Sequence, residues 1–379
     1  MVNISSYSKA FGLVACLLFV GCGPVRFSAD TKSLASVDPN NDGSDTNTPP
    51  DGTDNGGTKN MRYVGTVERA ANKVDIVLVV DDSSSMSPDN AKLANRLSGF
   101  VTALENSDID WQMCVTVTRA VNTSSGYRWG ASMFWQNYTP PAGTPQYILR
   151  SSASNLSTIF SSTMTYIGSG WANSDDERGI KSAYWHVYNG DLRYSNNSGC
   201  YRQDAALAYI FISDEDERSV GGDQSAVFYA SEANKPLEND DKPEVFIDWV
   251  KSTFGSNKRF TANSIIVIPG DTACMTSQDA NGASKSHYGH TYAKLSSLTG
   301  GGVGSICATD YAANLNLFLN RITNSLGSVP LECAPVGNVT VTISPNMGTV
   351  TSRVEGINLI LTPAVPEGRT ITVDYKCQQ

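Results

Sequence analysis

The sequence predicts an α/β protein with a doubly wound, mainly parallel, Rossmann-like sheet and a small C-terminal antiparallel β module. Two patterns support this. From about residue 61 to 331, short apolar runs typical of buried strands alternate with segments whose apolar residues recur at helical spacing. Such alternation favours a parallel sheet with helices on both faces. From 332 to 379, apolar residues instead alternate with a period of two, as in antiparallel strands.

The expected elements follow one another along the chain. The apolar runs that predict strands lie at 74–80, 111–118, 207–213, 264–268 and 303–307. The helical patterns lie at 88–105, 155–167, 178–188, 243–254, 290–298 and 309–326.

The start of the chain carries an export signal. An apolar stretch at 11–20, too short to span a bilayer, ends in Leu-Phe-Val-Gly-Cys at 18–22, which resembles a bacterial lipobox. The resemblance implies that residues 1–21 are a signal peptide and that Cys22 carries lipid. Gly23, which replaces an inner-membrane retention Asp, implies the outer membrane. The alternative is an ordinary secretory signal with an incidental cysteine.

Residues 22–60 are expected to form a tether. From Ala29 to Asn60 the chain consists mostly of Asp, Asn, Thr, Gly, Pro and Ser, and it has too few large apolar residues to offset the entropy of ordering. Its typical reach is on the order of 30 Å. We therefore expect a lipid-anchored head held away from a membrane, on the cell surface or facing the periplasm.

The remaining six cysteines indicate disulfides, because an even number in an exported chain favours them. Sequence alone does not choose among the possible pairings. We favour pairs that bracket one compact unit and obtain the last by elimination: Cys333–Cys377, Cys274–Cys307 and Cys114–Cys200. These cysteines have no C-x-x-C spacing, so we do not expect a structural zinc site.

A polar loop directly follows the apolar run 74–80. Residues 81–86 read Asp-Asp-Ser-Ser-Ser-Met, so Asp81, Ser83 and Ser85 occupy alternate positions of a tight turn. One carboxylate and two hydroxyls can then face one point, and such hard oxygens suit Mg²⁺. A helix N-cap is the simpler explanation, but a cap needs only one such residue.

This D-x-S-x-S spacing after a buried strand resembles the first loop of the metal-ion-dependent adhesion site of von Willebrand factor A domains. The resemblance implies two further metal-binding loops. In the second, Glu177 matches the Glu of integrin β subunits, with Ser174 and Asp176 as alternatives. In the third, Asp214 follows an apolar run and matches the family's Asp. Glu215 replaces the usual Gly, and it and the acids beyond it could hold a second cation or favour Ca²⁺.

The family also implies a short antiparallel edge strand, which we expect near Tyr147 to Leu149. Ligands of open α/β sheets bind beyond the carboxyl ends of the strands, where the loop 119–145 should also open. Its aromatic residues Trp129, Trp135 and Tyr138 are candidate ligand contacts. The alternative is that they pack this loop onto the body of the domain.

The resemblance implies a protein that binds another protein through Mg²⁺, or Ca²⁺ or Mn²⁺, with an acidic side chain of the partner completing the site. We expect adhesion to a cell or matrix; an envelope scaffold facing the periplasm is the alternative within the same class. We do not expect an enzyme, since His287 and His290 lack the Glu of a zinc-protease motif. A metal-dependent hydrolase is the alternative of another class. A net charge of −9 argues against nucleic acid.

Overall fold

The structure is a computed structural model, and the part of the chain that it describes begins at residue 57. It covers 57–67, 73–86, 89–90, 92–94, 100, 102–104, 109–123, 126–169, 176–188, 197–223, 225, 236–281, 286–309, 311–363, 365–366 and 368–378. The predicted signal peptide, Cys22, most of the tether and Ser174 lie outside these residues. No helix within them is long and apolar enough to cross a bilayer.

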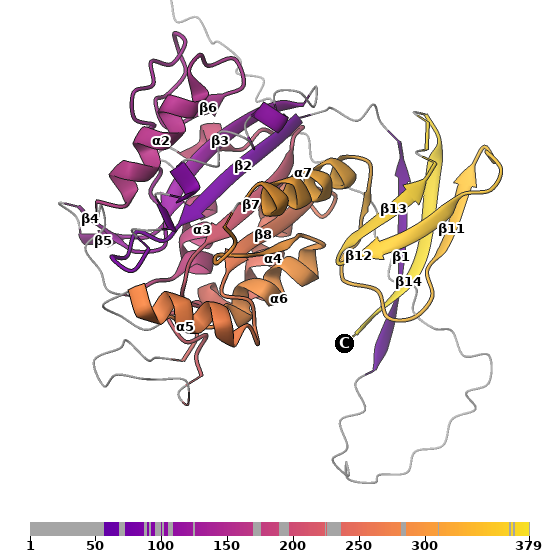
Figure 1. Cartoon of the computed structure of the whole chain (residues 1–379). Helices are drawn as coiled ribbons and strands as arrows, with labels where there is room; N and C mark the ends of the chain where they lie inside the picture. Colours follow the sequence, from indigo (N-terminus) through magenta and orange to yellow (C-terminus); the bar gives the residue numbers. More distant parts are fainter. Residues whose placement is uncertain are drawn as a thin grey trace, which may run out of the picture.

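A six-stranded sheet forms the centre of the larger domain, with the strand order β6-β3-β2-β7-β8-β9 (Figure 1). Neighbouring strands from β3 to β9 are parallel, and β6 is an antiparallel edge strand, which confirms the predicted fold class. Val80 lies opposite both Val117 and Ile212, so three adjacent strands end level with one another. The strands are β2 (Lys73–Val80), β3 (Asp110–Val117), β6 (Leu149–Arg150), β7 (Ala206–Ile212), β8 (Phe260–Ile266) and β9 (Val303–Ser305).

Helices cover both faces of this sheet because successive strand residues point to opposite sides. Ile76 and Leu78 pack into a core with α2 and α7, whereas Val77 and Val79 pack into a second core with α3, α4 and α6. The helices are α2 (Leu156–Ile167), α3 (Gly179–Tyr188), α4 (Pro243–Phe254), α5 (Thr272–Asn281), α6 (His290–Thr299) and α7 (Ala312–Leu326), with short 3₁₀ turns η1 (Asn197–Cys200) and η3 (Asn239–Asp241).

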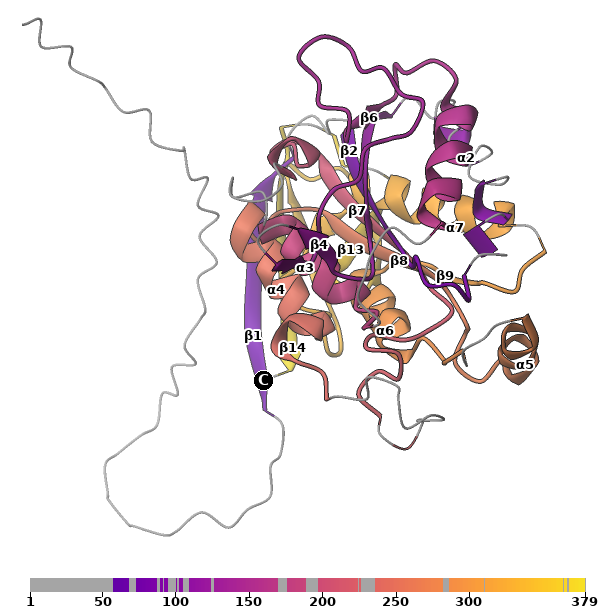
Figure 2. The ribbon, with the colours of Figure 1, turned by 90° about the vertical axis from the view of Figure 1, so that its left-hand side faces the viewer.

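Helix α5 was not predicted from the sequence. It stands at the edge of the body and makes only slight contact with other helices and strands (Figure 2). Cys274 and Gln278 are buried, and most of its other side chains are exposed, so it has no apolar stripe that a periodicity argument could detect. The disulfide Cys274–Cys307 fastens it beside the start of α7.

The β module consists of two three-stranded sheets around its own core. Its strands are β1 (Thr58–Thr66), β14 (Thr370–Gln378) and β11 (Thr340–Ser344) in one sheet, and β10 (Val329–Pro330), β13 (Asn358–Thr362) and β12 (Thr351–Glu355) in the other. Strand β1 corrects the expected boundaries. Residues 58–60 were placed in the tether and 61–66 in the larger domain, yet β1 pairs with β14 along its whole length. Only Met61, Tyr63 and Gly65 of this exposed edge strand are partly buried, so its alternation is weak.

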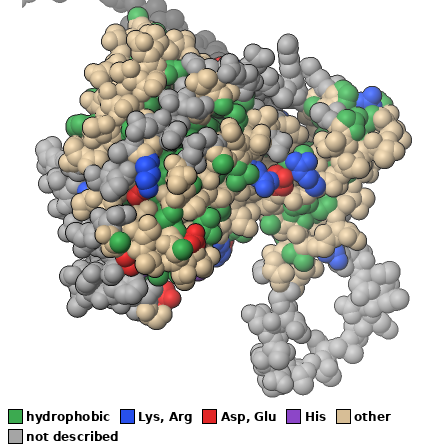
Figure 3. All heavy atoms as spheres, in the orientation of Figure 1, with side chains coloured by type: hydrophobic (Ala, Val, Ile, Leu, Met, Phe, Trp, Pro, Cys, Tyr) green, Lys and Arg blue, Asp and Glu red, His purple; other side chains and the backbone are tan. Residues whose placement is uncertain are grey.

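The two domains pack directly against each other. The Asn358 side-chain amide donates to the Thr299 carbonyl at 2.8 Å, and the Lys251 ammonium donates to the Leu331 carbonyl at 2.8 Å. Gly300, with φ of +69°, approaches the backbone of Glu355 so closely that a Cβ would lie 2.2 Å from its carbonyl oxygen. On the face shown in Figure 3, basic and acidic side chains are intermingled rather than gathered into a patch of one sign.

All three disulfides favoured from the sequence are present: Cys114–Cys200, Cys274–Cys307 and Cys333–Cys377. The first lies beside a buried polar network around His186. Its imidazole Nε2 is 2.9 Å from the Ser132 hydroxyl, and its Nδ1 contacts the Tyr201 hydroxyl. Burial lowers the pKa of His186 to about 3, so the ring is neutral near pH 7.

We predict that His186 makes the fold acid-sensitive. Because its pKa is lower in the folded state than the unfolded value of about 6.5, the unfolded state binds the extra proton between these values. Stability should therefore fall by about 1.4 kcal/mol per pH unit as pH drops from 6.5 toward 3. Urea unfolding in EDTA from pH 4 to 8 should show this slope in wild type relative to His186→Gln. Curves that run parallel for the two proteins would contradict the prediction.

Candidate metal centre

Backbone hydrogen bonds join three loops at the carboxyl ends of β2, β3 and β7. The Asp81 amide donates to the Ile212 carbonyl at 2.9 Å, and the Thr118 amide donates to the Val80 carbonyl at 3.1 Å. The Arg178 amide in turn donates to the Thr118 carbonyl at 2.8 Å. The loops after β2 and β7 and the segment before α3 therefore meet at one edge of the sheet.

The residues predicted for the first and third metal-binding loops converge there. The hydroxyls of Ser83 and Ser85 are 2.9 Å apart, and Ser85 donates to a carboxylate oxygen of Asp214 at 3.2 Å. Asp81 accepts from the Ser83 amide at 2.8 Å and from the Ser213 hydroxyl at 2.6 Å. All are at least nine-tenths buried. Ser213 was not predicted, although it immediately precedes Asp214 in the sequence.

Glu177 approaches the same point from the segment before α3. It is 7% exposed, and the Ser219 hydroxyl donates to its carboxylate at 3.3 Å. Burial raises its pKa well above the ordinary range, and the negative charges of Glu215 and Asp81 raise it further. Its predicted alternative Asp176 is instead paired with a basic side chain, Arg218, at 3.3 Å.

The acids beyond Glu215 do not belong to the site. The carboxylate of Asp216 accepts from the backbone amide and hydroxyl of Thr291, at 3.0 to 3.1 Å, at the start of α6. Glu217 accepts from the amides of Ile180 and Lys181, at 2.7 and 3.0 Å, at the start of α3. Both acids satisfy helix N-termini, where negative charge is favourable. For these two, the expectation of a second cation is wrong, because their oxygens are already used.

The chemistry of the convergent residues fits a divalent cation. Among the described residues, the donors to Asp81, Glu177 and Asp214 are serine hydroxyls and a backbone amide rather than basic side chains. Burial raises the pKa of Asp214, and the charges of Asp81 and Glu215 add to this rise. A cation would relieve the repulsion, and carboxylates with hydroxyls are ligands that Mg²⁺ or Ca²⁺ accepts.

Two of the three predicted aromatic contacts are wrong. Trp135 and Tyr138 are 0% and 6% exposed in the main core, and the Trp135 indole donates to the Met113 carbonyl at 3.2 Å. The chain turns back after β3 and runs beside it, since the Met133 amide donates to the Val115 carbonyl at 2.9 Å. This half of the loop therefore moves away from the carboxyl end of β3, and its aromatics pack it onto the sheet.

Trp129, the third predicted contact, packs against basic side chains of the segment that starts α3. Its ring is half-buried, and the charged groups of Arg178 and Lys181 lie 5.3 and 5.5 Å from its centre. Both bases also pair with Glu238, so the structure places Trp129 beside the start of α3, and its role as a ligand contact stays a prediction.

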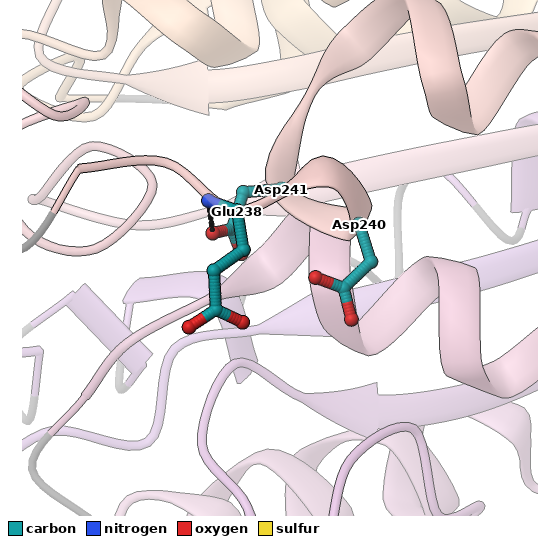
Figure 4. A group of neighbouring side chains, drawn as sticks. All are labelled: Glu238, Asp240 and Asp241. Atoms are coloured by element: carbon teal, nitrogen blue, oxygen red, sulfur yellow. Dashed lines mark hydrogen bonds between the residues drawn. The ribbon is translucent and has the colours of Figure 1, made fainter.

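A second group of acids, Glu238, Asp240 and Asp241, has carboxylate oxygens within 4.8 Å of one another (Figure 4). Basic side chains already neutralise it. Arg178 lies 2.6 Å from Asp241 and 2.8 Å from Glu238, and Lys181 lies 2.8 Å from Glu238. Hydrogen bonds from these two bases lower the pKa of Glu238 to about 2. This group is an ion-pair network that fixes the start of α3 against η3.

Comparisons with known proteins add little to this geometry. No family model and no curated protein matches the sequence. Solved structures that match include the pilus adhesin SpaC of Lactobacillus rhamnosus GG (12% identity, TM-score 0.34, 86% of this chain and 42% of that one). Two others are a von Willebrand factor type A protein of Catenulispora acidiphila (13%, 0.33, 85% and 61%) and the human COPII-coat protein Sec24c (8%, 0.35, 84% and 46%). The chain spans less than two thirds of each, and likenesses this distant carry no argument about function.

We predict that Mg²⁺, Ca²⁺ or Mn²⁺ raises the thermal midpoint of the protein, because a ligand that binds only the folded state stabilises it by about 2.7 kcal/mol at a hundred times its Kd. Asp81→Ala should abolish the shift. Glu238→Gln is the matched control, since it alters the other acidic group and should keep the shift. Scanning calorimetry with and without EDTA measures this. A shift lost in Glu238→Gln but kept in Asp81→Ala would contradict this prediction and place the cation at Glu238, Asp240 and Asp241 instead.

Proposed function

We propose that this chain is an exported protein that binds another protein through a divalent cation at the centre formed by Asp81, Ser83, Ser85, Glu177 and Asp214. The observation that carries the proposal is the convergence of buried carboxylates and hydroxyls at the level ends of three parallel strands. Open α/β sheets bind ligands at this edge. The bound cation would supply a coordination position that an acidic side chain of the partner can take.

The chain's own residues would divide the work. Asp81 and Asp214 supply negative charge, and their hydrogen bonds to Ser213 and Ser85 fix how the carboxylates are oriented. The hydroxyls of Ser83 and Ser85 add neutral oxygens, which leave more positive charge on the cation than a further carboxylate would. We expect Trp129, half-buried against Arg178 and Lys181, to add a rigid aromatic surface for partner contact.

We propose binding rather than catalysis, in adhesion to a cell or matrix. Two of the histidines argue against a general base at the centre: His186 is buried and neutral within its own hydrogen-bond network, and His290 lies exposed at the start of α6. His287 is buried, and its backbone amide donates to the Asp214 carbonyl at 3.0 Å. Cation-dependent turnover of a phosphate or ester substrate would favour the hydrolase alternative.

To test the proposal without a known partner, a cyclic peptide library displayed on phage can be panned against the protein in Mg²⁺ and eluted with EDTA. We expect the eluted peptides to carry an Asp or Glu at one fixed position and to lose binding to Asp81→Ala but not to Glu238→Gln. Peptides without acidic enrichment, or no EDTA-elutable binders at all, would contradict the proposal.

We further propose that the protein is anchored through lipid on Cys22. The apolar stretch that ends in Gly21-Cys22 supports this proposal. Expression in a bacterial host with an alkyne fatty acid should label the wild-type protein, and Cys22→Ala should lose the label and give a soluble or uncleaved product. Equal labelling of both proteins would refute the anchor. Protease treatment of intact cells then separates a surface position from a periplasmic one.

A further inference from the structure

Arg119 lies between two of the metal-binding loops. It directly follows Thr118, whose amide donates to the carbonyl of Val80 and whose carbonyl accepts from the amide of Arg178. Val80 precedes Asp81, and Arg178 follows Glu177. Nothing in the sequence singled out Arg119, because an arginine after a buried strand has no motif around it.

The guanidinium of Arg119 is held in one orientation. Its Nε donates to Asp82 Oδ1 at 2.9 Å, and its Nη2 donates to the Asp82 carbonyl at 2.9 Å and to Oδ2 at 3.3 Å. The Asp82 side chain is 0% exposed and that of Arg119 is 12% exposed. Nη1 has no hydrogen bond to the residues that the structure describes.

A second arginine–aspartate pair, at the opposite end of β2, shows what a purely structural arrangement looks like. At the amino end of β2, Arg202 Nε donates to Asp75 at 2.7 Å, and its Nη2 donates to the carbonyls of Val74 and Asp110. Its Nη1 also has a partner, the Asp110 carboxylate at 2.9 Å. Every side-chain nitrogen of Arg202 has an acceptor, whereas Nη1 of Arg119 has none among the residues that the structure describes.

The positive charge of Arg119 would favour an acidic ligand at the site. With a divalent cation bound, ionised Asp81, Glu177 and Asp214 would together outweigh its charge and repel an acidic ligand. The charge of Arg119 acts on Asp81 and Glu177 and opposes that repulsion. A guanidinium also presents parallel N–H donors that match a carboxylate.

Building on the proposed function, we propose that Arg119 recognises the partner's acidic side chain: the carboxylate that reaches the cation through one oxygen accepts a hydrogen bond from Nη1 of Arg119 through the other. The site would therefore select a carboxylate over a neutral carbonyl or amide ligand.

The test uses an acidic peptide eluted with EDTA and the same peptide with its Asp or Glu changed to Asn or Gln. Fluorescence polarisation in Mg²⁺ compares both peptides on wild type, Arg119→Gln, Arg119→Lys and the matched control Arg202→Gln. One charge-assisted hydrogen bond corresponds to roughly tenfold or more in affinity. We expect Arg119→Gln to weaken the acidic peptide about tenfold and the amide peptide less than about twofold. Arg119→Lys should fall between, and Arg202→Gln should leave peptide binding unchanged.

Calorimetry with Mg²⁺ alone should show cation binding intact in Arg119→Gln. If it is lost, Asp82→Asn breaks the same pair but keeps the guanidinium. Retained preference of Asp82→Asn for the acidic peptide would support recognition, and its loss would show that Arg119 only positions the loop. Equal weakening of acidic and amide peptides by Arg119→Gln, or no weakening, would overturn this inference alone. A failure to find any EDTA-elutable peptide would overturn the proposed function and this inference with it.

Discussion

The burial of several carboxylates at the ends of three adjacent parallel strands is the constraint on which the rest of the site depends. Burying an ionised carboxylate without a partner is costly, and neighbouring carboxylates raise that cost. Hydrogen bonds from serine hydroxyls reduce this cost: Ser213 donates to Asp81, Ser85 to Asp214 and Ser219 to Glu177. Hydroxyls orient a carboxylate without cancelling its charge, so that charge is left for the proposed cation to compensate.

The loop after β7 also connects the site to two neighbouring helices through consecutive acids. Asp214 faces the centre, whereas Asp216 and Glu217 accept hydrogen bonds at the starts of α6 and α3. The same loop is tied to the segment before α3, since the Arg218 amide donates to the Glu177 carbonyl at 2.7 Å. Residues 213–220 are buried although they form a loop. Acids that sequence reasoning could only count are therefore divided between one ligand position and two helix ends.

Sequence reasoning succeeded where a pattern has one physical outcome. The apolar runs of β2 and β7 fixed the sheet, and Asp81 and Asp214 follow from where those runs end. It failed where the outcome depends on packing. Whether Trp135 faces a ligand or the core depends on the path of the loop after β3, which no local pattern encodes. Helix α5 depends on a disulfide and β1 on an edge pairing with β14, so neither needs a strong apolar period of its own.

The pairing of β1 with β14 changes how the two domains must be understood. Thr58 lies opposite Gln378, so both ends of the described chain meet in the β module, and the larger domain is inserted between them. The Cys333–Cys377 disulfide fastens β14 to the segment after β10, whereas β1 is held by hydrogen bonds and by partly buried Met61 and Tyr63. A fragment that begins at residue 61 would remove the first part of this strand, and one that ends at 331 would leave β1 without its partner. The β module therefore holds the strands on both sides of the larger domain and is not only a C-terminal addition. The chain runs from β1 in this module into β2, whose last residue precedes Asp81 in the candidate metal centre.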